Sequence, residues 1–319
     1  MAQAVGVPPG ATVRRPPSAV ELELRPSLPP RKRSKIERTP ARVLFARRKD
    51  AAALRPAAIG TYSRGCLAGG QRLAPTGPAW QAMRLSRNRN WGHPALVRLV
   101  ERLAVEAKRA GEWPGLLVGD LAQPRGGPML TGHVSHQIGL DADIWLTPAP
   151  DRVLTRRERE RMSAISMLRN RLEVNPKRFT RAHFLLIKRA ASYPSVDRIG
   201  VHRAIKRALC QMETGDKSWL RKISGWRGHH YHMHIRISCP RSSIACRNQR
   251  AKRPGDGCAD MDRWHARLKA YLERPKPKVK AKPRVRKKRK PRARREIMMS
   301  RLPAACRTVL TAGEPTRLR

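Results

Sequence analysis

Acidic residues are scarce in this chain of 319 residues, where 23 Asp and Glu stand against 70 Lys and Arg and the formal net charge is +47. Such an excess favours anionic partners, namely nucleic acid, membrane head groups or an acidic cell-wall polymer. Phe and Tyr are also few, but a hydrophobic content of 40% is enough for a core. The composition therefore indicates a protein that is globular in part and binds an anionic partner, but it does not distinguish nucleic acid, membrane and cell wall.

No Cys-x-x-Cys pair is present, which argues against a thiolate zinc site. The six cysteines are dispersed along the chain, at Cys66, Cys210, Cys239, Cys246, Cys258 and Cys306. We therefore expect three disulfides and an oxidising compartment. The alternative is six buried, reduced thiols in a cytosolic protein.

Long apolar runs are missing as well. No segment is long and apolar enough to span a membrane. Residues 1–52 contain no apolar run of the ~7 to 15 residues that a secretory signal needs. Because the disulfides predict export, we expect either a true start downstream of Met1 or an export route with another signal.

The composition changes along the chain and predicts four parts. Residues 1–56, rich in Pro, Arg and Ala, are expected to be disordered, and residues 57–265 to form the folded domain. Residues 266–299 contain a Lys/Arg/Pro run at 274–295 that is typical of an extended linker, most simply a solvated spacer. The tail at 300–319 carries Cys306, which we expect to be tied back to the domain, closing a long loop.

Apolar periodicity inside the domain predicts both helices and strands. Helices are expected at 94–111, 180–191 and 202–211, and strands at 115–119, 142–146, 197–201 and 232–237. The strands and helices do not alternate regularly as βαβ units. We therefore predict an α+β domain with a central, largely antiparallel sheet flanked by helices.

Two short stretches carry candidate metal ligands. His136, Asp141 and Asp143 lie close together, and His232 and His234 follow almost a hundred residues later. Side chains two apart in a strand share a face, so His232 and His234 should point into one cavity, as should the two carboxylates. Imidazole and carboxylate donors at such spacing predict a metal site on the sheet, and a zinc hydrolase.

Other interpretations of these residues have to be weighed. The His cluster could be a chance feature of a basic loop, and the two carboxylates could cap a turn or pair with surface Arg. However, Arg125 is the only Lys or Arg between Gly111 and Asp151, and keeping cations away from a bound metal avoids repulsion. The remaining histidines outside these stretches are expected to be structural: His93, His183, His202 and His265.

Several motifs resemble one known family. They are residues 60–66 (GTYSRGC), 86–94 (SRNRNWGHP), 124–127 (PRGG), 132–143 (GHVSHQIGLDAD), 232–234 (HMH) and 254–258 (PGDGC). Together they resemble the penicillin-insensitive murein endopeptidases, which belong with the lysostaphin-like and D-alanyl-D-alanine-cleaving zinc peptidases. The likeness covers roughly residues 58–265 and the Cys306 tail.

The resemblance implies one catalytic Zn²⁺ held by His136, Asp143 and His234, with His232 as general base. His133 and His229 match further active-site histidines of the family, and His133 is a further candidate metal ligand. The implied disulfides join Cys66 to Cys306, Cys210 to Cys258 and Cys239 to Cys246. Asn170 and Glu173 stand where the family can carry a second metal, so no second zinc is expected.

The implied activity is hydrolysis of the D-alanyl to meso-diaminopimelate cross-link of peptidoglycan in the periplasm, by zinc-activated water. Arg125 or the segment 86–90 is a candidate for binding the stem-peptide carboxylates. A D,D-carboxypeptidase would use the same ligands, and a wall-binding module would lack catalysis. A non-enzymatic polyanion binder is the alternative from another class, but the basic tracts lack interleaved aromatic residues, so no specific nucleic acid is expected as partner. A homodimer is left open.

Overall fold

The computed structural model describes residues 34–274 and 296–313. Its centre is a seven-stranded sheet in the order β10, β9, β11, β8, β7, β5, β4. The strands are β10 Ile223–Trp226, β9 Val196–His202, β11 His232–Ile237, β8 Asp141–Trp145, β7 Leu116–Val118, β5 Trp80–Ala82 and β4 Thr76–Gly77. Four of the six neighbouring pairs are antiparallel, and β10 with β9 and β7 with β5 are parallel. The predicted α+β class with a largely antiparallel sheet is confirmed.

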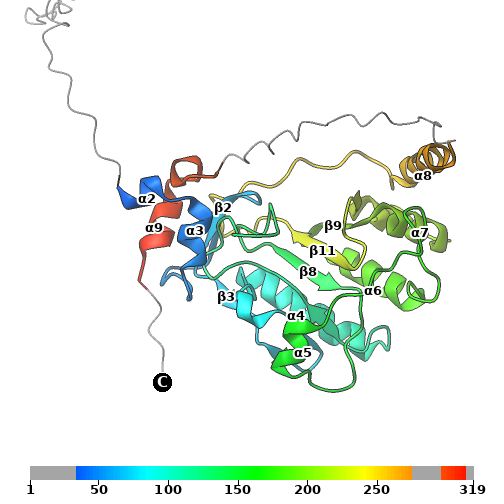
Figure 1. Ribbon diagram of the computed structural model, residues 1–319, viewed down its shortest axis with the longest axis horizontal. Coiled ribbons are helices and arrows are strands. Elements are labelled where there is room, and N and C mark those ends of the chain that lie inside the picture. Colours follow the sequence, from blue (N-terminus) through cyan, green and yellow to red (C-terminus); the bar gives the residue numbers. More distant parts are fainter. Residues whose placement is uncertain (1–33, 275–295, 314–319) are drawn as a thin grey trace, which may run out of the picture. The chain divides into compact units, whose positions relative to one another are not determined.

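Amphipathic helices pack on this sheet (Figure 1). α4 Pro94–Arg109 contacts β8, α6 Arg181–Ser192 contacts β9, and α7 Arg203–Met212 contacts β9 and β10. α5 is the short helix Arg156–Arg161. α4 begins at Pro94 because proline suits the first turn and the His93 imidazole accepts a hydrogen bond from Ala95 N. Its apolar stripe, which includes Leu96, Leu99 and Leu103, is buried in the main core. The three predicted helices therefore form within two residues of their expected ends.

Three of the histidines that we expected to be structural, His93, His183 and His202, form hydrogen bonds at the starts of helices. His202 caps α7 as His93 caps α4, since its Nδ1 accepts from Ala204 N. His183 sits in the first turn of α6, where it bonds Thr180 and the carbonyl of Leu146. Each imidazole thus satisfies backbone groups at a helix start.

A second, smaller core joins residues 41–68 to residues 299–310. It lies among helix α3 (Ala41–Ala46), the hairpin of β1 (Ala57–Thr61) with β2 (Arg64–Ala68), and helix α9 (Ala305–Thr311), which gather together in Figure 1. Phe45 is fully buried there. The prediction that residues up to 56 are disordered is therefore wrong from α2 (Lys35–Arg38) onward. The error arose because Phe45 is covered by a segment far away in sequence; residues 1–33 lie outside the described part.

The predicted domain end at 265 is also too early. α8 runs from Cys258 to Glu273 and packs on α7, so part of the expected linker is helical. Most of the basic run at 274–295 lies outside the described residues. The two short strands β3 (Gln71–Arg72) and β6 (Trp91–Gly92) pair separately from the main sheet.

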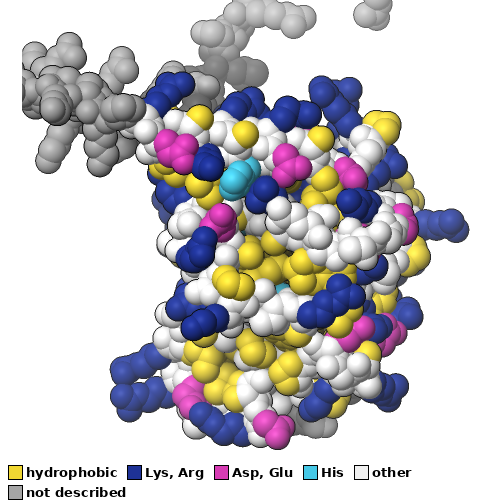
Figure 2. Space-filling view, turned by 90° about the vertical axis from the view of Figure 1, so that its right-hand side faces the viewer, with side chains coloured by type: hydrophobic (Ala, Val, Ile, Leu, Met, Phe, Trp, Pro, Cys, Tyr) yellow, Lys and Arg dark blue, Asp and Glu magenta, His cyan; other side chains and the backbone are white. Residues whose placement is uncertain are grey.

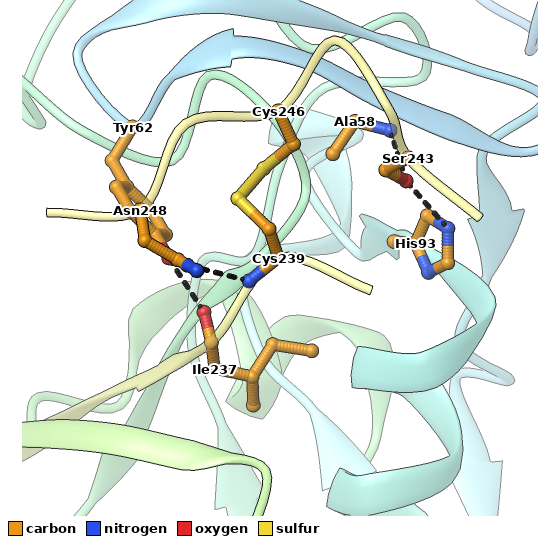
Figure 3. The surroundings of a disulfide bond; sticks show 8 residues. All are labelled: Ala58, Tyr62, His93, Ile237, Cys239, Ser243, Cys246 and Asn248. Carbon is orange, nitrogen blue, oxygen red and sulfur yellow. Dashed lines mark hydrogen bonds between the residues drawn. A yellow bond between two sulfur atoms is a disulfide. The ribbon is translucent and has the colours of Figure 1, made fainter. Parts of the chain in front are cut away.

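Three disulfides join Cys66 to Cys306, Cys210 to Cys258 and Cys239 to Cys246, the same pairs that the family resemblance implied. The first closes a separation of 240 residues and holds α9 against β2. The Cys239 to Cys246 loop follows β11 directly (Figure 3). Its Ser243 hydroxyl accepts from Ala58 N, and the Tyr62 hydroxyl donates to the carbonyl of Ile237. These contacts fix the end of the strand that carries His232 and His234.

Lys and Arg side chains are spread widely over the face of the protein drawn in Figure 2, with fewer acidic side chains among them. Hydrophobic side chains gather in the middle of that face. Among the helices in the described ranges, none combines the length and apolar character that crossing a bilayer requires.

Candidate metal centre

Two neighbouring strands of the sheet bring the candidate ligands together. β8 and β11 are antiparallel, and their register places Asp143 opposite His234. Met233 and Ile235 are buried in the main core, so His232 and His234 share the other face of β11. The face assignments predicted from the alternation are confirmed.

His136 reaches the same point from the loop before β8. Its φ of 65° places it in the left-handed region, and Gly139 follows with a φ of 70°. Asp141 Oδ2 accepts a hydrogen bond from His136 N at 3.0 Å, which holds this turn. His136 Nδ1 bonds the carbonyl of Leu121 at 2.6 Å, so that Nε2 faces the strands.

The inward-facing atoms of His136, Asp143 and His234 form a compact triangle. His136 Nε2 lies 3.4 Å from Asp143 Oδ1 and 3.2 Å from His234 Nδ1, and His234 Nδ1 lies 3.0 Å from Asp143 Oδ1. Donors ~2.0 to 2.1 Å from a tetrahedral zinc ion are roughly 3.3 Å from one another. The triangle therefore has the dimensions of three corners of such a coordination shell.

The surroundings of Asp143 Oδ1 show whether the site suits a metal ion. This oxygen is buried and forms no hydrogen bond of good geometry with any residue that the structure describes, although nitrogens of His136, His232 and His234 lie within 3.0 to 3.7 Å of it. An unsatisfied buried carboxylate oxygen costs free energy unless a cation neutralises it. The donor set, with two or more imidazoles and one carboxylate, suits Zn²⁺.

The pKa shifts differ among the side chains of the site. Burial would lower the pKa of His234, but Asp141 and Asp143 raise it to about 9, so this imidazole has to lose a proton on binding metal, whereas the other ligands are already in the metal-binding form. Burial opposes ionisation of Asp143, but the neighbouring His136 and His232 outweigh it and hold its pKa well below the usual range. Burial lowers the pKa of His136 and brings that of His232 to about 4, so both are neutral near pH 7. Neutral imidazole is the form that binds metal.

His133 lies beside the triangle. Its Nε2 is 3.0 Å from Asp120 Oδ2 and its Nδ1 is 3.5 Å from Asp143 Oδ2. His133, His136 and Asp143 each offer a ligand atom, and these atoms lie within 4.8 Å of one another. His133 therefore stands close enough to be a fourth ligand, as a member of the group that the sequence analysis selected.

Asp120 was missed by the sequence analysis. It accepts from His133 and forms ion pairs with Arg87 at 3.1 Å and Arg89 at 2.9 Å. Burial would raise its pKa, but the His133 hydrogen bond and the charge of Arg89 lower it to about 2. The cations come from 86–94, so the lack of Lys and Arg within 111–151 does not keep positive charge away in space. That part of the argument for a metal site is wrong.

His232 and His229 line the site on its outer side. His232 Nε2 is 3.7 Å from Asp143 Oδ1, and its Nδ1 is buried without a hydrogen-bond partner among residues 34–274 and 296–313. His229 Nδ1 bonds the carbonyl of Arg227 at 3.0 Å, and its ring lies 4.9 Å from that of His232. A cavity of about 330 Å³ opens beside His133, Asp143 and His232.

Arg125 does not reach this site. It is fully buried, and its guanidinium donates to backbone carbonyls of Asp50, Ala51, Val309, Leu310, Ala312 and Gly313. The expectation that Arg125 binds substrate carboxylates is therefore wrong, because its donors hold the C-terminal end of α9 against the segment before β1.

Sequence comparison identifies the class to which this centre belongs. Residues 58–311 match the family model described as penicillin-insensitive murein endopeptidase. A penicillin-insensitive murein endopeptidase of Haemophilus influenzae is 43% identical over 219 residues, covering 69% of this chain and 74% of that protein. The one from Pectobacterium atrosepticum is 38% identical over 222 residues, covering 69% and 78%.

The chain therefore belongs to the penicillin-insensitive murein endopeptidase family. It is a peptidase of the metallopeptidase class, and the family description names murein, the peptidoglycan of bacterial walls, as what is cleaved. The three disulfides are consistent with the cell envelope, where such bonds persist.

Proposed function

We propose that this protein is a zinc-dependent D,D-endopeptidase that hydrolyses the D-alanyl to meso-diaminopimelate cross-link of peptidoglycan. The observation that carries the proposal is the triangle of His136 Nε2, Asp143 Oδ1 and His234 Nδ1, whose sides measure 3.0 to 3.4 Å. These three side chains would hold one Zn²⁺, with His133 as the further candidate ligand. A bound zinc ion polarises the scissile carbonyl and lowers the pKa of water from ~15.7 towards ~7.

His232 is proposed as the general base. Its Nε2 faces the centre, and burial brings its pKa to about 4, so the imidazole is neutral and able to accept a proton near pH 7. It would take the proton of the attacking water at Nε2 and return it to the leaving amine. Since water is the nucleophile, no serine is available for a β-lactam to acylate.

His229 is proposed to stabilise the oxyanion that forms in the transition state. Its Nδ1 proton is directed to the carbonyl of Arg227, so a second proton at Nε2 is needed for this role. Burial lowers the pKa of His229, which means that the developing negative charge has to favour that protonation.

Hydrolysis of defined muropeptides tests the proposal. Purified protein should cleave a cross-linked muropeptide dimer into two monomers, and a chelator should abolish the cleavage, with Zn²⁺ restoring it. Mass spectrometry of the products separates the alternatives, because a D,D-carboxypeptidase would release free D-alanine and leave the cross-link intact. We also propose the periplasm as the site of action, since the three disulfides and the polymeric substrate meet there.

A further inference from the structure

A second cavity, of about 970 Å³, is lined in part by residues 226–228 and His230, which precede β11. Its walls are the segment 166–171, the start of α7, residues 226–230 and the inner side of α8 at Trp264 and Leu268. His230 Nδ1 bonds Ser166 Oγ at 2.9 Å and so joins two of these walls. The cavity is therefore built from several separate elements and is not a single loop surface.

Its lining is strongly basic. Arg169, Arg171, Arg203 and Arg227 contribute to it, and in the described part of the chain no Asp or Glu does. Arg169 pairs with Glu173, but within residues 34–274 and 296–313 no carboxylate forms an ion pair with Arg171, Arg203 or Arg227. Most other concave parts of so basic a surface carry acidic partners, as Asp120 does beside Arg87 and Arg89. This cavity keeps three guanidinium groups available to an anion.

Two tryptophans complete the walls. The Arg203 guanidinium stands 6.0 Å from the centre of the Trp264 ring, which holds that cation towards the cavity. Trp226 forms the other aromatic wall and also touches the metal centre, because its ring lies 5.3 Å from that of His234 and 5.1 Å from that of His229. A single side chain, Trp226, thus separates the cavity from His234 of the metal centre.

From this arrangement we propose that the Arg171, Arg203 and Arg227 cavity is a binding subsite for the free carboxylates of a peptidoglycan stem peptide. The proposal rests on the proposed function. The two N–H groups of a guanidinium match the two oxygens of a carboxylate in geometry, and the indole rings of Trp226 and Trp264 offer apolar surface to the rest of the stem peptide. The 330 Å³ cavity, lined by His133, Asp143 and His232, is a separate space next to the centre, and cleavage inside a cross-linked peptide requires room for more than one stem.

Charge-neutralising variants test the subsite. Arg171→Gln together with Arg227→Gln should raise the KM for a cross-linked muropeptide dimer by about 10-fold, with little change in kcat, because two partly exposed ion pairs are lost. Arg98→Gln with Arg109→Gln, which removes the same charge from exposed positions on α4, is the control and should leave KM unchanged. On a dimer whose free carboxyl groups are amidated, wild type and both double variants should have the same KM.

An equal KM for the cavity variant and the control on the free-acid dimer would overturn the subsite while leaving the proposed function intact. Binding of an uncleavable muropeptide monomer, followed by tryptophan fluorescence, separates the two proposals. If wild type binds the monomer in a way that depends on Arg171 and Arg227 but cleaves no dimer, the subsite stands and the proposed cleavage falls. A DNA duplex that binds more tightly than the monomer, with the same dependence on Arg171 and Arg227, would refute the carboxylate subsite.

Discussion

His234 is held between two carboxylates of the same strand: its Nε2 lies 2.9 Å from Asp141 Oδ1 while its Nδ1 faces Asp143. Burial disfavours a charged imidazole, but Asp141 and Asp143 outweigh this and raise the pKa of His234 to about 9. A carboxylate behind an imidazole fixes the orientation of the ring. Because an imidazole with a pKa of about 9 is protonated on both nitrogens near pH 7, Nδ1 has to release its proton when it binds metal.

Asp141→Asn should therefore weaken zinc binding by roughly 10- to 100-fold, since the amide keeps the shape but removes the charge behind His234. Titration with a competing chelator measures the effect. Asp151→Asn changes an exposed carboxylate elsewhere and serves as the control. Unchanged zinc affinity in the Asp141 variant would show that Asp141 has no influence on the centre.

Removing the two histidines of β11 should have different effects. His234→Ala should lose both zinc and cleavage, because a corner of the donor triangle is gone. His232→Ala should keep its zinc and lose turnover by roughly 10²- to 10⁴-fold, the usual contribution of a general base. Metal analysis and dimer hydrolysis measure both, with His93→Asn as a control outside the centre; zinc loss in the His232 variant would make His232 a ligand instead.

How far the sequence could predict this structure depended on the range of the interactions involved. The alternation in 232–237 predicted the strand and the shared face of His232 and His234, because the period of two is a local property. The ends of α4 followed from Pro94 and Gly111 in the same way. Where neighbours along the chain determine the structure, the pattern was sufficient.

Residues whose surroundings come from distant segments were not predictable in this way. Phe45 lies in a Pro- and Arg-rich stretch and is buried in a cluster to which β2 and the distant segment 299–310 contribute. Arg125 suggested an anion site by its charge, yet its partners are carbonyls at 50–51 and 309–313. Asp120 carried no local signal, since its role depends on His133 and Arg89 meeting it in space.

Arg125→Ala should destabilise the fold without altering the site. Several buried carbonyls lose their donor, so the free energy of unfolding should fall by at least about 3 kcal/mol. Urea unfolding and the KM for a muropeptide dimer measure the two effects, and Arg64→Ala, at an exposed position of β2, is the control. A raised KM with normal stability would restore Arg125 as a substrate-binding residue.

The disulfides should differ in what they contribute. Cross-linking restricts the unfolded chain more for longer loops, so loss of the Cys66 to Cys306 bond, with a separation of 240, should cost about 5 kcal/mol in the chain-entropy model. Loss of the Cys239 to Cys246 bond, with a separation of 7, should cost about 2 to 3 kcal/mol. Paired Cys→Ser variants compared by urea unfolding measure this order, and the reverse order would contradict the entropic account.

The caps of α4 and α7 should make the fold sensitive to acid. Burial brings the pKa of His202 to about 4, below the ~6.5 of an unfolded histidine, so the unfolded state binds more protons between these values. Stability from this group is therefore complete above about pH 6.5 and is lost as the pH falls towards 4. The substitution His202→Asn keeps a side-chain acceptor at the cap but removes the titrating group. The urea-unfolding midpoint of this variant should therefore fall less than that of wild type between pH 7 and pH 4.5. His93→Asn should act in the same direction, because the pKa of His93 is also lowered by burial. Parallel losses in wild type and both variants would mean that neither cap histidine is linked to folding, and that the acid sensitivity arises from other groups, such as the buried His136 and His232 or the carboxylates.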